Sequence, residues 1–322
     1  MIPIDDPSLF LAIVFLAIGI ALLYFGAEGL IKGSVKLAID LGITPLVIGL
    51  TVVAFGTSSP ELVVSIEAGI SGNSEIALGN VVGSNICNIA LILGVAALIK
   101  PMKVDRSLMK TDVLYMIGFT LLLIIFVIDG DISRIEGAVF VALIIAYIVM
   151  TGIISRKKNT IDIPDEIKEE MKAKRKPITN IFFIVIGLAM LITGATVFLE
   201  GAVAIAKYAG VSNAIIGLTL VAFGTSLPEL ATSIVASMKD HNEIILGNAI
   251  GSNIFNILLI LGVASVILPI SAAGFDNVDF GVMLGVSIII IPLAYQKMTV
   301  TRWNGVFLLL IYIAYTYYLY VK

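Results

Sequence analysis

The chain reads GLTVVAFGTSSPEL at residues 49–62 and GLTLVAFGTSLPEL at residues 217–230. A second stretch follows in each case, EIALGNVVGSNICNIALILG at 75–94 and EIILGNAIGSNIFNILLILG at 243–262. Residues 42–101 align with residues 210–269 without a gap, at a constant offset of 168, and well over half of the positions are identical. Chance does not produce such a match, so the sequence contains two copies of one unit that arose by duplication.

The composition is that of a protein surrounded by lipid. Hydrophobic residues make up 59% of the chain and charged residues 13%, against roughly 25% charged residues in a soluble domain. The mean hydropathy is +1.09. A water-soluble protein of 322 residues could not bury that much apolar surface. The single cysteine, Cys87, excludes a disulfide within the chain.

Ten segments are long and apolar enough to cross a bilayer, which takes ~20 residues. The first is retained in the mature protein, because residues 1–10 contain two aspartates and no Lys or Arg, unlike a signal peptide. The ten predicted spans are residues 9–31, 45–70, 76–99, 108–128, 135–154, 178–199, 213–237, 244–267, 278–295 and 303–320.

The basic residues predict the orientation. With both termini outside, all Lys and Arg residues lie on the cytoplasmic side except Arg134, Lys207 and Lys322. The charged segment 155–177 is then a cytoplasmic linker. Losing one span, or inverting the chain, would destroy this distribution.

The two copies are predicted to have opposite orientations. They occupy spans two and three and spans seven and eight, and equivalent spans are five apart, which is an odd number. We therefore expect an all-α integral membrane protein built from two inverted five-helix repeats, residues 1–154 and 178–322. Inverted repeats of this kind are characteristic of secondary transporters whose substrate site lies at the membrane midplane.

Each GTSxPE motif predicts a broken helix. Pro60 and Pro228 cannot donate a hydrogen bond to the carbonyls of Gly56 and Gly224. We expect free carbonyl oxygens from about Ala54 and Ala222 onward, which is tolerable at this depth only beside a polar cavity.

One carboxylate from each repeat, Glu61 and Glu229, is predicted to enter that cavity. A charge at the bilayer centre costs at least ~2.5–3.5 kcal/mol, so these groups require a cation or protons. Carboxylates, hydroxyls, amides and carbonyls are hard oxygen ligands, which favour calcium and sodium over zinc or copper.

The second motif adds a predicted glycine break and further polar side chains within spans three and eight. Ser84 and Asn88 are four residues apart on one helical face, as are Ser252 and Asn256, and we expect all four to coordinate the ion. For Asn80, Asn85, Asn248 and Asn253, coordination and capping of broken helices remain open.

At these motifs the chain resembles the sodium/calcium exchangers of the cation/calcium antiporter superfamily. The resemblance covers nearly the whole chain and implies a site between four broken helices, two, three, seven and eight. The ion ligands that it implies are Glu61, Glu229, Ser84, Ser252, Asn88, Asn256, Ser58 and Ser226, with backbone oxygens around Ala54, Thr57, Ala222 and Thr225.

The resemblance also limits which ions are expected as substrates. Potassium-dependent relatives usually carry Asp where this chain has Asn256, and proton-coupled relatives usually lack GTSxPE. We expect calcium and sodium as substrates, the bilayer as surroundings, no cofactor, no enzymatic activity and no nucleic acid partner. One copy of the chain is expected to suffice for transport.

Three other functions remain as alternatives. A calcium/proton exchanger would use Glu61 and Glu229 as proton carriers. A cation channel would need an open path, which broken helices closed on both sides disfavour. An intramembrane hydrolase lacks support, because the one histidine, His241, lies in a predicted loop.

Overall fold

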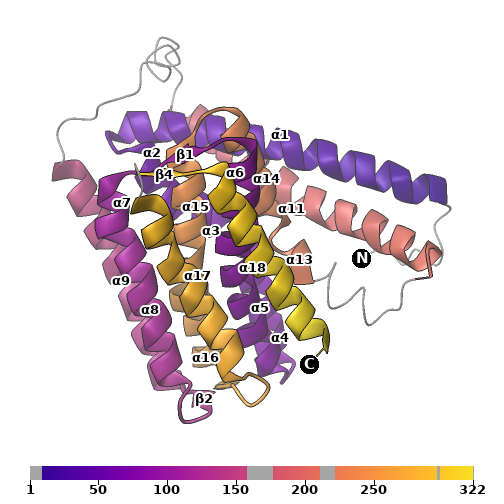
Figure 1. The fold of residues 1–322 in the computed structure, drawn as a ribbon. Helices are drawn as coiled ribbons and strands as arrows, with labels where there is room; N and C mark the ends of the chain where they lie inside the picture. Colours follow the sequence, from indigo (N-terminus) through magenta and orange to yellow (C-terminus); the bar gives the residue numbers. More distant parts are fainter. Residues whose placement is uncertain (1–8, 158–176, 211–221, 296–297, 322) are drawn as a thin grey trace.

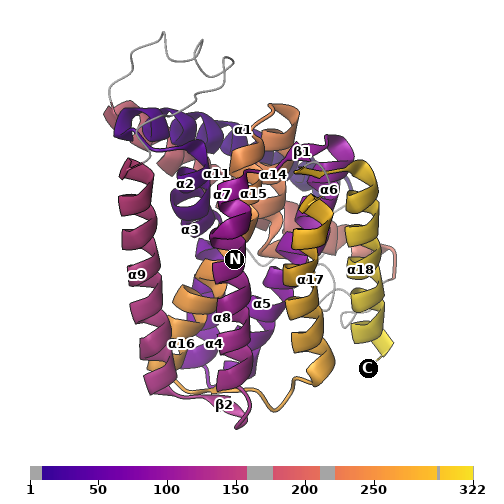
Figure 2. The same cartoon turned by 60° about the vertical axis from the view of Figure 1, so that its left-hand side comes forward.

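A computed structural model describes residues 9–157, 177–210, 222–295 and 298–321. Nearly all of them are helical, and most of the helices run steeply from one end of a bundle to the other (Figure 1). Figure 2 shows α8, α9, α17 and α18 side by side in this direction. The helices and the short strands follow the repeat that the sequence predicts.

The first half contains thirteen elements. They are α1 (Leu9–Leu41), α2 (Pro45–Ile48), the π-helical turn η1 (Gly49–Val53), α3 (Ala54–Thr57), α4 (Ser59–Ile70), α5 (Ser74–Ile86), the π-helical turn η2 (Cys87–Ile92), α6 (Leu93–Ile99), β1 (Met102–Lys103), α7 (Arg106–Lys110), α8 (Asp112–Phe126), β2 (Asp131–Ile132) and α9 (Arg134–Lys157).

The second half repeats this order apart from α7, which has no separate helix as its counterpart among the described elements. Its described elements are α11 (Pro177–Tyr208), α13 (Ala222–Gly224), α14 (Leu227–Met238), α15 (Asn242–Phe255), the π-helical turn η4 (Asn256–Leu261), α16 (Gly262–Ile267), β3 (Ile270–Ser271), α17 (Asn277–Tyr295), β4 (Thr299–Val300) and α18 (Arg302–Val321).

The spans agree with the prediction where they can be compared. Among the described residues, eight helices are long and apolar enough to cross a membrane, and the bent pair Pro45–Thr57 and Ser59–Ile70 makes a ninth span. The predicted span 213–237 begins in residues outside the described set, and its later part is α13 and α14. The linker prediction concerns residues 155–177, of which 158–176 are likewise outside that set.

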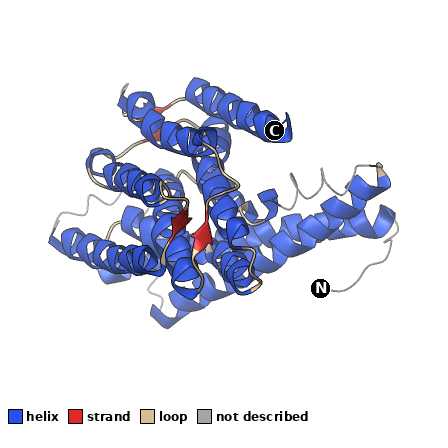
Figure 3. Ribbon diagram, turned by 90° about the horizontal axis from the view of Figure 1, so that it is seen from below, coloured by secondary structure: helices blue, strands red, loops and turns tan. Residues whose placement is uncertain are grey.

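The two strand pairs confirm that the halves are inverted. β1 pairs with β4 at one end of the bundle, and β2 pairs with β3 at the other (Figures 1 and 3). At an offset of 168, β1 is equivalent to β3 and β2 to β4, so equivalent strands lie at opposite ends. The register agrees as well, because the pair Lys103↔Thr299 corresponds to the pair Ser271↔Asp131. A two-fold axis in the membrane plane is the simplest relation that produces this.

The repeated helices form the centre of the protein. Ser74–Ile99 and Asn242–Ile267 are 72% and 78% buried over their most apolar windows, against 17–33% for the other spans. The predicted glycine break in each is wrong, because both helices run on without interruption. A π-helical turn, η2 or η4, occupies the middle instead, and the Leu93 amide donates to the Asn88 carbonyl five residues earlier. Such turns add one residue and are frequent at functional sites.

The first helix of each half is longer than predicted. α1 continues ten residues past the predicted end at Ile31, and α11 continues from Leu199 to Tyr208. The extension of α1 is amphipathic, since Ser34, Val35 and Ala38 are fully buried. Packing rather than contact with lipid therefore sustains this part of the helix.

Helices α1 and α11 lie obliquely across the bundle and extend beyond it, side by side (Figures 1 and 3). Their contact depends on glycines spaced seven residues apart, Gly19, Gly26 and Gly33 in α1 and Gly187, Gly194 and Gly201 in α11. A Cβ atom at Gly26 would lie 2.8 Å from the Gly187 carbonyl oxygen, and one at Gly187 would lie 2.6 Å from the Leu30 amide nitrogen. The backbones are in direct contact, as is usual where small residues join membrane helices.

Ion pairs gather at the end that holds β1 and β4. Glu28 of α1 binds Lys32 within the same helix at 2.8 Å and Lys239, at the end of α14, at 2.7 Å. Lys100 binds Asp240 close by. The Glu28–Lys239 pair joins the oblique helix α1 to the central bundle at this end.

The Gly26→Ala variant should unfold at a lower temperature than the wild type. Its Cβ would meet the backbone of α11, which cannot rotate away, and such overpacking costs about 1–3 kcal/mol. The measurement is thermal unfolding of the detergent-solubilised protein. Gly118→Ala in α8 is the matched control, since nothing lies within 4 Å of its Cβ position. Equal stability of the two variants would contradict the direct backbone contact.

Candidate cation site

The predicted break in the second span is present, and it positions Glu61. α3 ends at Thr57, Ser58 adopts a turn conformation, and α4 begins at Ser59, with a bend of 45° between the two parts. Pro60 then occupies the first turn of α4, where its missing amide hydrogen is harmless. Glu61 lies in the same turn, where the positive end of the helix dipole stabilises a carboxylate.

The break begins later than predicted, and the expectation of a free Ala54 carbonyl is wrong. The Ser58 amide donates to the Ala54 carbonyl oxygen at 3.0 Å. Proline at position 60 removes only the bond to the carbonyl four residues earlier, that of Gly56, so the helix remains intact up to Thr57. The Thr57 hydroxyl oxygen also lies 3.4 Å from the Ala54 carbonyl oxygen, and the role of Ala54 as an ion ligand stays a prediction.

The second repeat is built in the same way. α13 ends at Gly224, α14 begins at Leu227, and Glu229 lies in its first turn. The Ser226 amide donates to the Phe223 carbonyl oxygen at 3.1 Å rather than to a residue four positions earlier. Ala222 belongs to α13, the short helix before the break.

The two breaks are connected across the repeats. The Ser58 hydroxyl donates to Glu229 Oε1 at 2.9 Å, and the Ser226 hydroxyl donates to Glu61 Oε1 at 3.5 Å. Both glutamates are almost completely buried, 0% and 1% exposed. Neither Glu61 Oε2 nor Glu229 Oε2 has a hydrogen-bond partner among the described residues. Each carboxylate is therefore half satisfied by the opposite repeat and has one oxygen left.

The central helices contribute further buried polar oxygens. The Ser84 hydroxyl oxygen lies 3.3 Å from that of Ser226. Three further oxygens, Ser252 Oγ, Asn88 Oδ1 and Asn256 Oδ1, are buried and make no hydrogen bond within the described part of the chain. Ser84 is thus connected to Glu61 through Ser226. Ser252, Asn88 and Asn256 are buried in the same bundle, and their part in the site stays a prediction.

The two predicted threonines, Thr57 and Thr225, have hydrogen-bond partners within the protein. Thr57 Oγ1 lies 3.1 Å from both the Val53 carbonyl oxygen and Asn248 Oδ1. Thr225 Oγ1 lies 3.5 Å from Asn80 Oδ1. Both side chains link a broken helix to the central helix of the other repeat, and this supports a bracing role for Asn80 and Asn248.

Two residues that the sequence did not indicate also have unpartnered hydroxyl oxygens. Thr232 and Ser233 lie within about one turn of Glu229 in α14 and are buried. Ser65, the equivalent of Ser233, accepts a hydrogen bond from Asn80 at 3.1 Å. In the sequence, Thr232 and Ser233 are recognisable only as two adjacent polar residues one turn after Glu229 in an apolar helix.

The arrangement fits a hard cation. An unsatisfied buried polar atom costs about 1–3 kcal/mol, so each unpartnered oxygen of the two glutamates, Ser252, Asn88 and Asn256 would be stabilised by a cation within reach. The described residues contain no group of three or more His, Cys, Asp or Glu placed to hold a metal ion. The site has two acidic groups among neutral oxygens, which is a donor set suited to calcium or sodium.

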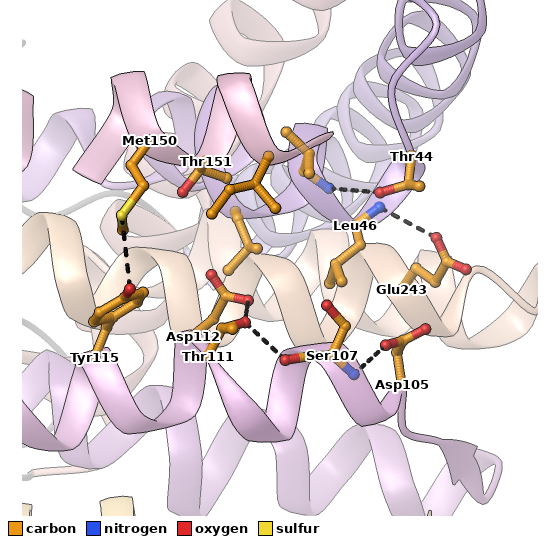
Figure 4. Close-up of a pocket in the computed structure, with 13 residues that line it drawn as sticks. Thr44, Leu46, Asp105, Ser107, Thr111, Asp112, Tyr115, Met150, Thr151 and Glu243 are labelled. Atoms are coloured by element: carbon orange, nitrogen blue, oxygen red, sulfur yellow. Dashed lines mark hydrogen bonds between the residues drawn. The ribbon is translucent and has the colours of Figure 1, made fainter. Parts of the chain in front are cut away.

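A second polar pocket lies near β1, and it is less suited to a cation (Figure 4). Its acidic side chains already accept hydrogen bonds, Asp105 from the Ser107 amide, Asp112 from Tyr147 and Glu243 from the Leu46 amide. Figure 4 shows the bonds of Asp105 and Glu243 along the wall of the pocket. Because its carboxylates stabilise helix ends, this pocket offers a cation far less than the central site does.

Comparison with known proteins agrees with this geometry. The sequence profile of one family, described as "Sodium/calcium exchanger protein", matches residues 11–152 and again residues 179–321. The chain belongs to this family. It is thus an integral, multi-pass membrane antiporter of the cation/calcium exchanger type and not an enzyme.

Several relatives align with this protein over almost its full length. The sodium/calcium exchanger MaX1 of Methanosarcina acetivorans is 34% identical over 94% of this chain and 96% of that protein. The putative antiporter CaxA of Alkalimonas amylolytica is 37% identical over 96% and 98%. A structure of the sodium–calcium exchanger NCX_Mj, soaked with Na⁺ and Sr²⁺, is 35% identical and superimposes with a TM-score of 0.81 over 95% of this chain and 98% of that one.

Replacing either central acid should remove cation binding. Glu61→Gln and Glu229→Gln should each weaken Ca²⁺ binding about 100-fold or more, because one of two charges that neutralise the ion is lost in a medium of low dielectric constant. The measurement is calorimetric titration of the purified protein with Ca²⁺. Without cations, both variants should be at least as stable as the wild type, since an uncompensated buried charge is gone.

Glu67→Gln is the matched control for this pair. Glu67 lies on α4 like Glu61, but its side chain is exposed. Calcium binding should be unchanged in this variant. Near-normal binding in Glu61→Gln and Glu229→Gln would place the site elsewhere in the protein.

Proposed function

We propose that this protein exchanges sodium for calcium across the membrane by alternating access. The observation that supports this most strongly is the buried pair Glu61 and Glu229, each with one unpartnered oxygen among neutral oxygen donors. The printed names of MaX1 and NCX_Mj, both sodium/calcium exchangers, favour the same coupling.

Charge neutralisation explains why exchange would be obligatory. The two glutamates provide about −2 charge, which one calcium ion neutralises. Several sodium ions, three by family resemblance, would use overlapping oxygens, so that calcium and sodium exclude each other. Without either, the change of access would close the site around two bare carboxylates in a medium of low dielectric constant, which is costly. The amide of Asn256 gives no third acid and favours a cycle without potassium.

Helices α1 and α11 are the proposed moving gate. They lie obliquely against the bundle, and their glycine contact offers smooth backbone surfaces. The central helices, by contrast, are deeply buried and carry the site. Motion of the first pair past a fixed core would change the access to the site without rebuilding it.

The end that holds β1 and β4 is proposed to face the cytoplasm. Lys32, Lys100, Lys239 and Arg302 meet there, and their hydrogen bonds and ion pairs involve neighbouring elements of that end. Basic residues concentrate on the cytoplasmic side of membrane proteins. The inner-membrane relative YrbG of Escherichia coli, 34% identical over 89% of this chain, fits a location in the cell membrane.

Calcium uptake into proteoliposomes tests the coupling. An outward sodium gradient should drive ⁴⁵Ca²⁺ accumulation, whereas an outward proton gradient at equal sodium should not. The Glu229→Gln variant, reconstituted at the same density, should show neither. Uptake that follows the proton gradient and ignores sodium would replace this proposal by calcium/proton exchange through the same glutamates.

The membrane potential should bias the cycle. If three sodium ions replace one calcium, each turn moves one net positive charge, which is worth ~2.3 kcal/mol per 100 mV. Sodium-driven calcium uptake should therefore accelerate when valinomycin and potassium make the interior positive, since each turn exports net positive charge. The measurement is the initial uptake rate at opposite potentials and equal sodium gradients. Rates that ignore the sign of the potential would rule out the three-to-one cycle.

A further inference from the structure

Four asparagines of the central helices α5, η2, α15 and η4 form one buried network. Asn85, Asn88, Asn253 and Asn256 are each at most 1% exposed. Asn88 Nδ2 donates to Asn253 Oδ1 at 3.0 Å, and Asn256 Nδ2 donates to Asn85 Oδ1 at 3.0 Å. The two bonds are equivalent under the repeat, and both cross from one half to the other.

A second pair of bonds closes the network. Asn85 Nδ2 donates to the Asn253 backbone oxygen at 3.4 Å, and Asn253 Nδ2 donates to the Asn85 backbone oxygen at 3.2 Å. The amides of Asn85 and Asn253 thus use both their nitrogen and their oxygen. Asn88 and Asn256 use only the nitrogen, and their oxygens have no hydrogen-bond partner in the described structure.

This asymmetry between the amides has a direct electrostatic meaning. An amide can present either an acceptor oxygen or a donor NH₂ group to its surroundings, and a cation is attracted by the first and repelled by the second. A buried amide oxygen without a partner is unfavourable by itself, and rotation of the Asn88 or Asn256 amide would replace this oxygen by the NH₂ group. The acceptor oxygens of Asn253 and Asn85 oppose this rotation by binding the nitrogen.

We propose that Asn85 and Asn253 are positioning residues, which hold the amide oxygens of Asn256 and Asn88, respectively, toward the transported cation. This inference rests on the proposed cation site and goes beyond it, because it assigns the orientation of each ligand amide to a residue of the opposite repeat. Neither positioning residue needs to touch the ion. Each repeat thereby completes the ligand set of the other.

A carboxylate provides the test, because it has an oxygen at both ends and needs no orientation. Asn253→Leu should weaken Ca²⁺ binding at least tenfold in the wild-type background, since Asn88 can then turn its NH₂ group toward the ion. In the Asn88→Asp background the same substitution should cost little or nothing. In the Asn256→Asp background it should still cost at least tenfold.

Because the two halves are equivalent, the same experiment can be made with Asn85 in place of Asn253, and the rescuing substitution is then the other one. Asn85→Leu should be rescued by Asn256→Asp and not by Asn88→Asp. The readouts are the Ca²⁺ dissociation constant from calorimetric titration and the thermal stability of the cation-free protein. Asn85→Ser and Asn253→Ser, too short to reach the neighbouring amide, replace the leucine variants if these fail to fold.

The outcomes separate this inference from the proposed function. Rescue restricted to the two matched combinations supports the positioning role. Equal losses of affinity in all backgrounds, accompanied by equal losses of stability, would show a merely structural role and overturn the inference while leaving the cation site intact. A wild-type protein that binds no Ca²⁺ would overturn the cation site and the inference together.

Discussion

The rest of the structure depends on two carboxylates that are buried in the interior of the membrane-spanning bundle. Glu61 and Glu229 are buried at the centre of an apolar bundle, and among the described residues each accepts one hydroxyl hydrogen bond. Their side chains are not accessible to solvent in this conformation, so the remaining oxygens require either a cation or a proton. The broken helices, the serines and the asparagines all serve to make that position tolerable. Function follows from the same requirement, because a site that is stable only when loaded couples the movement of one ion to that of another.

Inversion of the repeat makes this arrangement possible. Each half alone would present one glutamate, one hydroxyl pair and two amides, with no partner for most of them. In the assembled protein, Ser58 binds the glutamate of the second half and Ser226 binds that of the first. The asparagine network closes in the same crossed manner. Neither half contains a complete site, so the duplicated unit acquires its chemistry only when it packs against its inverted copy.

Much of this could be predicted from the sequence, and for identifiable reasons. Proline and a glutamate in an apolar span have few physical solutions, so the helix break and the buried acids were predictable from GTSxPE. The odd separation of the copies indicated the inversion, which the strand pairs confirm. The π-helical turns were not predictable, because they add one residue without any proline, and the glycines suggested a break instead. The length of α1 was underestimated because burial against neighbours, not hydropathy, sustains its last ten residues. Whether Asn85 and Asn253 meet an ion or each other depends on distances that spacing along one helix does not define.

The two halves nevertheless differ in one contact, the ion pair that holds α1 to α14. Glu28 and Lys239 hold α1 to α14 at the end with β1 and β4. The equivalent positions at the opposite end are Thr196 and Ser71, which carry no charge. If this ion pair breaks when α1 moves, the conformations open to the two sides differ in energy, and ~1 kcal/mol corresponds to about a fivefold ratio of populations. The ion gradients alone would still determine where transport stops, whereas the rates in the two directions would differ.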